Sequence, residues 1–261
     1  MKVTFTLELS EISVALRCKL ANELKDERVL SVLAKDESVM VRTVAAENPN
    51  TLASDLKQLA RDESEEVVFA ALKNPNISTD DLLSFFYYAR KIYYPKSYFE
   101  GKASNDLPVL SEFAAYMVLK SIAQNTKAPK AILAKISEAS DFDYDIRLDV
   151  AENPNTSQSI LKELAQDEDE FMRETVARNL NTPKSALKNL AKDKVDEVRK
   201  AVAENPNVSK SDLLILASDD DIGVRFVAKE RLNKLEPKTK SAAPKTKNTK
   251  SRATKDKSEA K

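Results

Sequence analysis

The feature that most constrains this sequence is a short polar motif that recurs at a fixed interval. The motif Asn-Pro-Asn occurs at residues 48–50, 74–76, 153–155 and 205–207, and as Asn-Leu-Asn at 179–181. The interval is 26 residues from Asn48 to Asn74, and again from Asn153 to Asn179. A constant period of this size is typical of proteins that stack one small structural unit many times. We therefore expect an elongated repeat protein.

Each copy predicts two short helices. In the copy at residues 157–179, Thr156 or Ser157 can cap the first helix, and 167–169 can form the turn that caps the second. Apolar residues recur on one face of each helix, at Ile160, Leu161, Leu164 and Ala165 and then at Met172, Val176 and Ala177. Neither helix can bury such a stripe alone, so neighbouring copies must stack. The pattern predicts an all-α solenoid.

A second sequence pattern, of aspartate and arginine, repeats with the same period as the asparagine motif. Aspartate precedes arginine by six residues in five copies, at Asp36/Arg42, Asp141/Arg147, Asp167/Arg173, Asp193/Arg199 and Asp219/Arg225. A column of arginines can bind phosphates, but a constant aspartate partner favours ion pairs within and between repeats. We interpret the column as a structural ladder, which the copy at Asp62 breaks because Val68 replaces the arginine.

These motifs resemble two related repeat families. The run from Val-Arg-x-x-Val-Ala to Asn-Pro-Asn-Thr, followed by Leu-x-x-Leu-Ala-x-Asp, is similar to the variant leucine-rich repeat (LRV), and the Asp/Arg spacing to HEAT repeats. The resemblance covers about residues 12–232 and implies a right-handed superhelix of α-helices. A described LRV protein also carries an iron–sulfur domain, but Cys18 is the only cysteine here. The resemblance therefore implies a fold and no chemistry.

The expected domains are an N-terminal cap or short strand at 1–11, the solenoid at 12–233 and a basic tail at 234–261. The tail holds ten Lys/Arg and three Asp/Glu. It has no large apolar residue after Leu235, which predicts disorder. Since the whole chain is formally neutral, the body is acidic. The tail can contact nucleic acid, another polyanion or the acidic body, or remain solvated.

The repeat is interrupted between Asn74 and Asn125, which are 51 residues apart. The enlarged unit at 79–125 predicts one long helix from Thr79 to Tyr94 and another from about Asp106 to Gln124. Eight of the sixteen Phe and Tyr residues lie between 85 and 99. They can fill the space between longer helices, anchor a protein or stack on nucleic acid bases. The candidate surface comprises Tyr87, Tyr88, Arg90, Lys91, Tyr94, Lys96 and Tyr98.

The resemblance to HEAT repeats predicts a partner-binding groove along the second helix of each copy, because in HEAT-like stacks that helix lines the concave face. When the copies are aligned on the ladder arginine, the positions of this second helix that face outward hold nine acidic and three basic residues. Such a surface repels duplex DNA and suits a basic protein segment. The candidate groove residues are Met40, Phe69, Leu148, Phe171, Phe226, Glu66, Glu174 and Glu197. The alternative is that some of these side chains fold under the next repeat.

The sequence lacks the residues that several kinds of catalytic and ligand-binding site require. The chain has no histidine and two glycines, which excludes histidine-based catalytic triads and Gly-rich phosphate loops. Acidic residues from Asp141 to Glu152 match the spacing of a calcium loop, but Ile146 stands where that loop needs glycine. We expect no metal, no cofactor, no membrane span and a cytoplasmic location.

The sequence therefore favours a protein-binding scaffold without enzymatic activity. The alternative is a nucleic-acid-associated protein that uses the lysine-rich tail and the aromatic and basic residues of 85–102. A third possibility is an enzyme similar to HEAT-like DNA glycosylases, although no catalytic constellation stands out.

Overall fold

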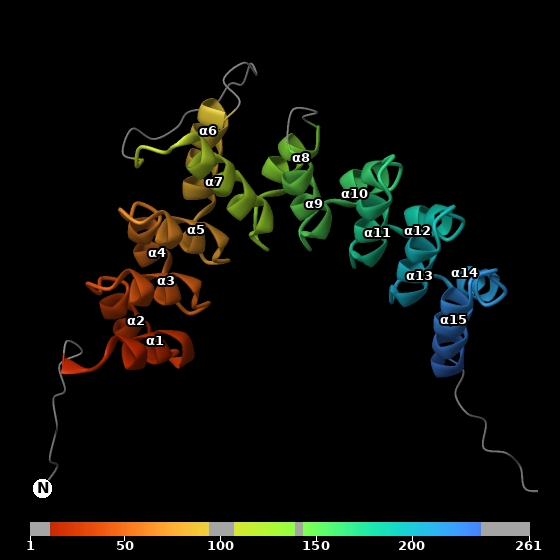
Figure 1. Cartoon of the computed structure of the whole chain (residues 1–261), viewed down its shortest axis with the longest axis horizontal. Helices are drawn as coiled ribbons and strands as arrows, with labels where there is room; N and C mark the ends of the chain where they lie inside the picture. Colours follow the sequence, from red (N-terminus) through yellow and green to blue (C-terminus); the bar gives the residue numbers. More distant parts are fainter. Residues whose placement is uncertain (1–10, 94–106, 139–142, 236–261) are drawn as a thin grey trace, which may run out of the picture.

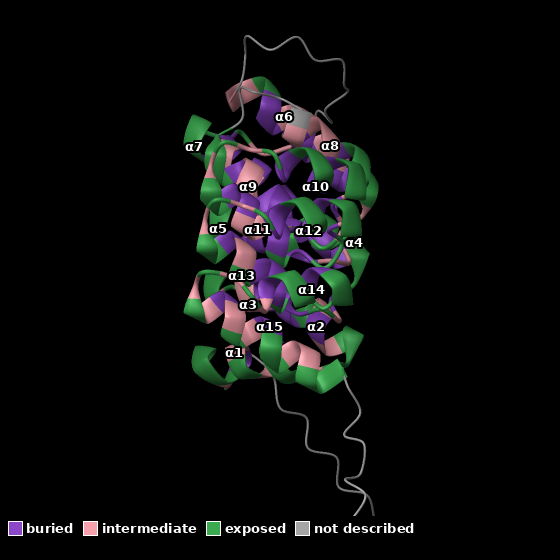
Figure 2. Cartoon of the chain, turned by 90° about the vertical axis from the view of Figure 1, so that its right-hand side faces the viewer, coloured by how far each residue is buried: buried purple, intermediate pink, exposed green. Residues whose placement is uncertain are grey.

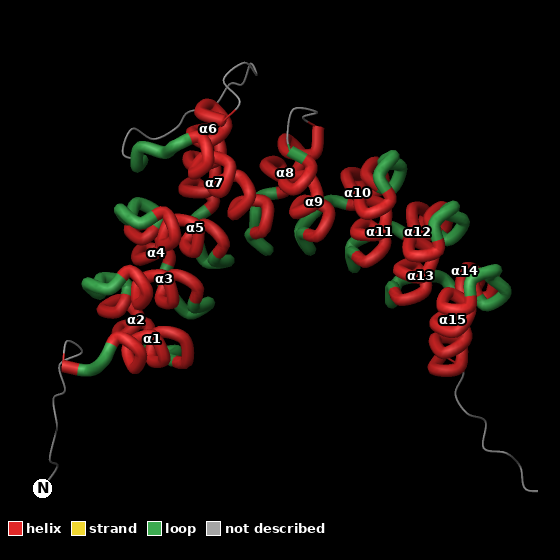
Figure 3. The backbone as a smooth tube through the Cα atoms, in the orientation of Figure 1, coloured by secondary structure: helices red, strands yellow, loops and turns green. Residues whose placement is uncertain are grey.

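The computed structural model describes residues 11–93, 107–138 and 143–235. These residues form fifteen α-helices, α1 to α15, and contain no strand (Figure 3). The helices follow one another along an arch from α1 to α15 (Figure 1). Each helix packs against helices that are one or two places away in the chain, which is the arrangement of an all-α solenoid.

The helices form two rows. The odd row packs helix against helix along the whole arch; it comprises α1 (Val14–Glu23), α3 (Val39–Glu47), α5 (Glu65–Lys73), α7 (Glu112–Gln124), α9 (Tyr144–Glu152), α11 (Glu170–Arg178), α13 (Asp196–Glu204) and α15 (Ile222–Leu235). The even row comprises α2 (Glu27–Leu33), α4 (Ala53–Leu59), α6 (Thr79–Tyr93), α8 (Lys130–Glu138), α10 (Gln158–Leu164), α12 (Lys184–Leu190) and α14 (Lys210–Leu216).

The core lies between the two rows. Figure 2 shows the odd and even helices as separate columns with the buried residues between them. Most even helices have seven residues, too few to be stable alone in water, so packing between rows must stabilise them. In the unit at residues 157–179, all seven residues of the predicted stripes are buried, which confirms both predicted helical faces.

Side-chain caps set the helix boundaries. The Ser157 hydroxyl accepts the N–H of Ile160, so Ser157 rather than Thr156 caps α10. Thr156 is buried, and its hydroxyl donates to the carbonyl of Val150 in the preceding helix. Asp169 caps α11 by accepting the N–H of Met172, as the sequence predicts.

The enlarged unit contains the two longest helices of the central part of the arch, and its second helix begins later than predicted. Helix α7 begins at Glu112 and not at Asp106, because the Ser111 hydroxyl caps it by accepting the N–H of Ala114. Phe85 and Phe86 are fully buried where α6 packs against α7. The expected N-terminal strand, the loop that follows α6 and most of the tail lie outside the described residues.

Candidate partner-binding surface

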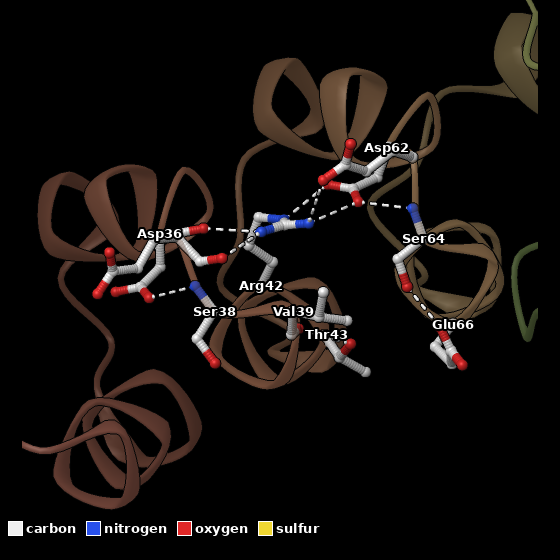
Figure 4. A network of polar contacts seen from close by, with 10 residues as sticks. Asp36, Ser38, Val39, Arg42, Thr43, Asp62, Ser64 and Glu66 are labelled. Atoms are coloured by element: carbon white, nitrogen blue, oxygen red, sulfur yellow. Dashed lines mark hydrogen bonds and ion pairs between the residues drawn. The ribbon is translucent and has the colours of Figure 1, made fainter.

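The ladder arginines join neighbouring repeats. Arg173 donates from Nε and Nη2 to both carboxylate oxygens of Asp193, 20 residues later, at 2.7 and 3.0 Å. Its Nη1 donates to the backbone carbonyls of Asp167 and Glu168 at 2.9 and 2.8 Å. Arg42 makes the same contacts with Asp62 and with the carbonyl of Asp36 (Figure 4). Each guanidinium therefore spans two repeats.

This geometry corrects the partner that the six-residue spacing predicts. The aspartate six residues before the arginine supplies a backbone carbonyl, and the next repeat supplies the carboxylate. The carboxylate of Asp193 accepts hydrogen bonds from the guanidinium of Arg173 and from the backbone N–H of Val195 in the turn. Burial raises the pKa of Asp193, but these hydrogen bonds outweigh it and hold the pKa below its ordinary value.

The ladder continues through several repeats and ends at the last one. Arg147 donates to Asp167, Arg199 donates to Asp219, and an additional rung joins Arg17 to Asp36. Arg225 donates to the carbonyls of Asp219 and Asp220. Asp141 lies outside the described residues. An open cavity of about 670 Å³ borders Arg173, but the guanidinium there is already paired with Asp193, which argues against a phosphate ladder.

A second ladder, of asparagines, was not evident from the sequence. The amide of Asn153 donates to the carbonyls of Ala123 and Asn125 in the preceding repeat, at 2.6 and 2.7 Å. Its Oδ1 accepts the N–H of Asn155 at 2.8 Å. Equivalent pairs of bonds hold Asn48, Asn74, Asn125, Asn179 and Asn205. The motif therefore joins repeats in addition to ending helices.

The asparagine ladder crosses the enlarged unit without a break. Asn125 donates to the carbonyls of Leu72 and Asn74, although these residues lie more than 50 positions earlier in the chain. At the C-terminal end Arg231 takes the asparagine position and donates to the carbonyls of Ala203 and Glu204. These two ladders join successive odd helices, so equivalent exposed positions follow one another along the odd row.

The predicted groove residues divide into exposed and half-buried groups. Met40, Phe171 and Phe226 are at least 60% exposed. Phe69 and Leu148 are half-buried against the core, so for these two the interpretation that they pack under neighbouring repeats fits better. Glu66 is exposed and accepts a hydrogen bond from the hydroxyl of Ser64 (Figure 4).

Three predicted groove residues meet at one small pocket between α11 and α13. Phe171, Glu174 and Glu197 line a cavity of about 170 Å³, together with Glu170 and Val195. Phe171 is 61% exposed in this cavity. The arrangement places an apolar anchor among three carboxylates.

The exposed anchors concentrate at one edge of the odd row, which we call the N-terminal edge. It comprises the residue before each odd helix and the first two residues of that helix. These 24 positions hold ten carboxylates and no lysine or arginine. Acidic residues there also stabilise the helix dipoles, but the dipole does not require exposed apolar residues. The edge nevertheless exposes Val14, Val39, Met40, Phe113, Tyr144, Phe171 and Ile222.

Basic residues of the predicted groove lie away from this edge. Arg178, in the last turn of α11, donates to Glu174 and Glu204, both at 2.8 Å. That arginine therefore neutralises part of the charge of Glu174, which also lines the Phe171 pocket, and of Glu204 in the last turn of α13. The N-terminal edge itself therefore combines ten carboxylates with exposed apolar residues and carries no basic residue of its own.

The candidate insertion surface is only partly exposed. Arg90 is buried at 5% exposure, so its prediction as a surface cation is wrong, because this position of α6 lies on the buried side of the helix. Tyr87 and Tyr88 are half-buried against the core, and Lys91 is exposed. Tyr94, Lys96 and Tyr98 lie outside the described residues.

The described part of the chain contains neither a metal-ligand cluster nor a helix that could span a membrane. No three acidic or cysteine side chains there converge as metal ligands would. Residues 144–152, which carry most of the calcium-like spacing, form helix α9 and not a loop. None of the described helices has both the length and the apolar content to cross a membrane.

The fold defines the chain as an α-solenoid repeat protein. The sequence of the chain matches no family model and no curated protein. Among solved structures it resembles a leucine-rich repeat variant described as having a novel repetitive structural motif. The two are 21% identical, the match covers 85% of this chain and 84% of the other, and the TM-score is 0.43. The solenoid architecture rests on the helices described above, and the likeness assigns no function.

Proposed function

We propose that this protein is a scaffold that binds a basic, partly apolar protein segment along the N-terminal edge of the odd row. The observation that carries the proposal is the pocket between α11 and α13. There Phe171 is mostly exposed and is surrounded by Glu170, Glu174 and Glu197. An exposed aromatic residue in a pocket is typical of the anchors that dominate protein interfaces.

The charge of the edge supports a basic partner. An edge that holds ten carboxylates and no lysine or arginine attracts a positively charged segment and repels an acidic one. The apolar residues among them add contact area that does not depend on charge. A repeat solenoid also offers a long, rigid surface, because the ladders fix one odd helix relative to the next.

Selection from a random peptide display library on the full-length protein tests this proposal. Selected peptides are expected to combine lysine or arginine with apolar residues. Their affinity, measured by fluorescence anisotropy, is expected to fall about tenfold or more in Phe171→Ala, the loss of about 1.4 kcal/mol typical of an anchor. The matched control is Ile215→Ala, which removes a 53% exposed side chain from the even helix α14.

Two results would contradict the proposal. One is selection of acidic peptides. The other is an equal loss of affinity in Phe171→Ala and Ile215→Ala, because binding would then not depend on the pocket. Higher salt is expected to weaken binding of the wild type more than that of Glu197→Gln, since the substitution removes one exposed carboxylate.

A further inference from the structure

A second cavity lies on the same edge, between α7 and α9, and has a different lining. Its volume is about 450 Å³, within the range of small-ligand sites. Four aromatic rings line it, together with two carboxylates; these residues are Tyr93, Phe113, Tyr116, Tyr144, Asp143 and Asp145. The enlarged unit builds this cavity, because Tyr93 comes from the end of the long helix α6.

The rings are held close together. The centroids of Tyr93 and Tyr116 are 5.6 Å apart, and those of Phe113 and Tyr116 are 6.4 Å apart. The Tyr93 hydroxyl donates to Asp143 at 2.6 Å, and the Tyr144 hydroxyl donates to Asp169 of the next repeat at 2.6 Å. These hydrogen bonds fix two of the rings before any ligand arrives.

The hydroxyl groups of Tyr116 and Tyr144 remain uncharged over the ordinary pH range. Burial, with the hydrogen bond to Asp169, raises the pKa of Tyr144 to about 12. Burial also raises the pKa of Tyr116. The negative charge of the cavity therefore comes from its aspartates, while the rings supply neutral π faces.

Lys120 pairs more closely with Asp149, which is not part of the cavity lining, than with Asp145, which is. Lys120 Nζ lies 3.2 Å from Asp149 but 4.0 Å from Asp145. Although burial lowers the pKa of Lys120, Asp149 outweighs it and the pKa is raised, which keeps the lysine paired there. The side chain of Asp145 remains 62% exposed.

We infer that this cavity receives an arginine side chain of the bound protein segment, between the aromatic rings and the two aspartates. Aromatic faces attract cations, and carboxylates at the same site exclude anions. Arginine fits better than lysine because its planar, weakly hydrated guanidinium can stack on a ring and donate two parallel hydrogen bonds to one carboxylate. The inference rests on the proposed function, since it names one residue of the segment.

The test uses N-acetylarginine amide as the probe and follows chemical-shift changes in NMR spectra of the full-length protein. The expected result is saturable shifts at Phe113, Tyr144 and Asp145, weaker binding of N-acetyllysine amide and none of the neutral citrulline analogue. Phe113→Ala is expected to weaken binding about threefold, and Asp145→Asn about fivefold. Phe113 is 66% exposed, so its substitution leaves the fold intact.

Phe171→Ala is the matched control, because it removes the same side chain from the other pocket and is expected to leave the arginine probe unaffected. The inference is overturned if the citrulline analogue binds as tightly as the arginine probe, or if lysine binds as tightly as arginine. It is also overturned if the substitution Arg252→Gln in the basic tail shifts the Tyr144 signal in the absence of the probe. The arginine in the cavity would then belong to the chain's own tail and not to a partner.

The two proposals fail separately. If library peptides depend on Phe171 but the arginine probe does not shift Phe113 or Tyr144, only the arginine inference fails. If the probe binds the cavity and no peptide is selected, the cavity is an arginine site while the scaffold function fails.

Discussion

Replacing one buried asparagine is expected to destabilise the whole arch more than replacing its neighbour two residues away. Asn153 is 3% exposed and makes three side-chain hydrogen bonds, two of them to the preceding repeat. The substitution Asn153→Ala removes all three. The carbonyl of Ala123, in the last turn of α7, then loses the contact that joins it to the next repeat.

The magnitude follows from the groups that lose their partners. The carbonyl of Asn125 keeps a second bond, from the N–H of Ala128. The carbonyl of Ala123 and the N–H of Asn155 lose the side-chain partners that Asn153 supplies. An unpaired buried polar group costs about 1–3 kcal/mol, and the N–H of Asn155 is only part-buried and costs less, so we expect a loss of about 3 kcal/mol in the free energy of unfolding.

Asn155→Ala is the matched control. Asn155 is half-buried, and its side chain makes one bond, to the carbonyl of Ala128 at 2.8 Å. The expected loss is about 1 kcal/mol. Urea unfolding followed by far-ultraviolet circular dichroism gives both values, provided that the slope of the unfolding free energy against urea concentration is the same in the wild type and both variants. Equal losses in the two variants, or a loss below about 1 kcal/mol in Asn153→Ala, would refute the structural role of the asparagine ladder.

Two further predictions concern ionisable groups. The hydrogen bond from Arg199 lowers the pKa of Asp219 in the folded state, so the stability it contributes is present above the unfolded pKa of about 3.9 and is lost as pH falls through the folded pKa. The free energy of unfolding is therefore expected to fall more steeply below about pH 4 in the wild type than in Asp219→Asn, and parallel curves would contradict this. Alkaline titration of tyrosine absorbance is expected to show a step at about pH 12 that Tyr144→Phe removes, since burial and Asp169 raise the pKa of Tyr144 to about 12. Persistence of that step in the variant would assign it to another tyrosine.

The aromatic residues of the enlarged unit show how one sequence cluster divides in three dimensions. Phe85 and Phe86 fill the space between α6 and α7, whereas Tyr93 lines a cavity. Phe113, outside that cluster in the sequence, joins the same cavity from α7. Sequence spacing identifies the cluster but does not assign its members to core or surface, because that depends on how two long helices pack.

The sequence by itself determined the repeated two-helix unit. A 26-residue period and apolar residues on one face of each helix leave few alternatives to stacking, and the buried stripe from Ile160 to Ala177 agrees with it. These signals are local: helical periodicity and caps act within a few residues of each other. The sequence alone does not place the start of α7, because Asp106 and Ser111 are both suitable helix caps and the structure uses Ser111.

Only the tertiary structure decided which polar groups meet. The carboxylate partner of Arg173 lies 20 residues later, and the carbonyl partners of Asn125 lie across the enlarged unit. Those distances depend on the angle at which one repeat stacks on the next, which no single repeat specifies. The same stacking brings Tyr93 of α6 to Tyr144 of α9, so the cavity exists only once the solenoid is assembled.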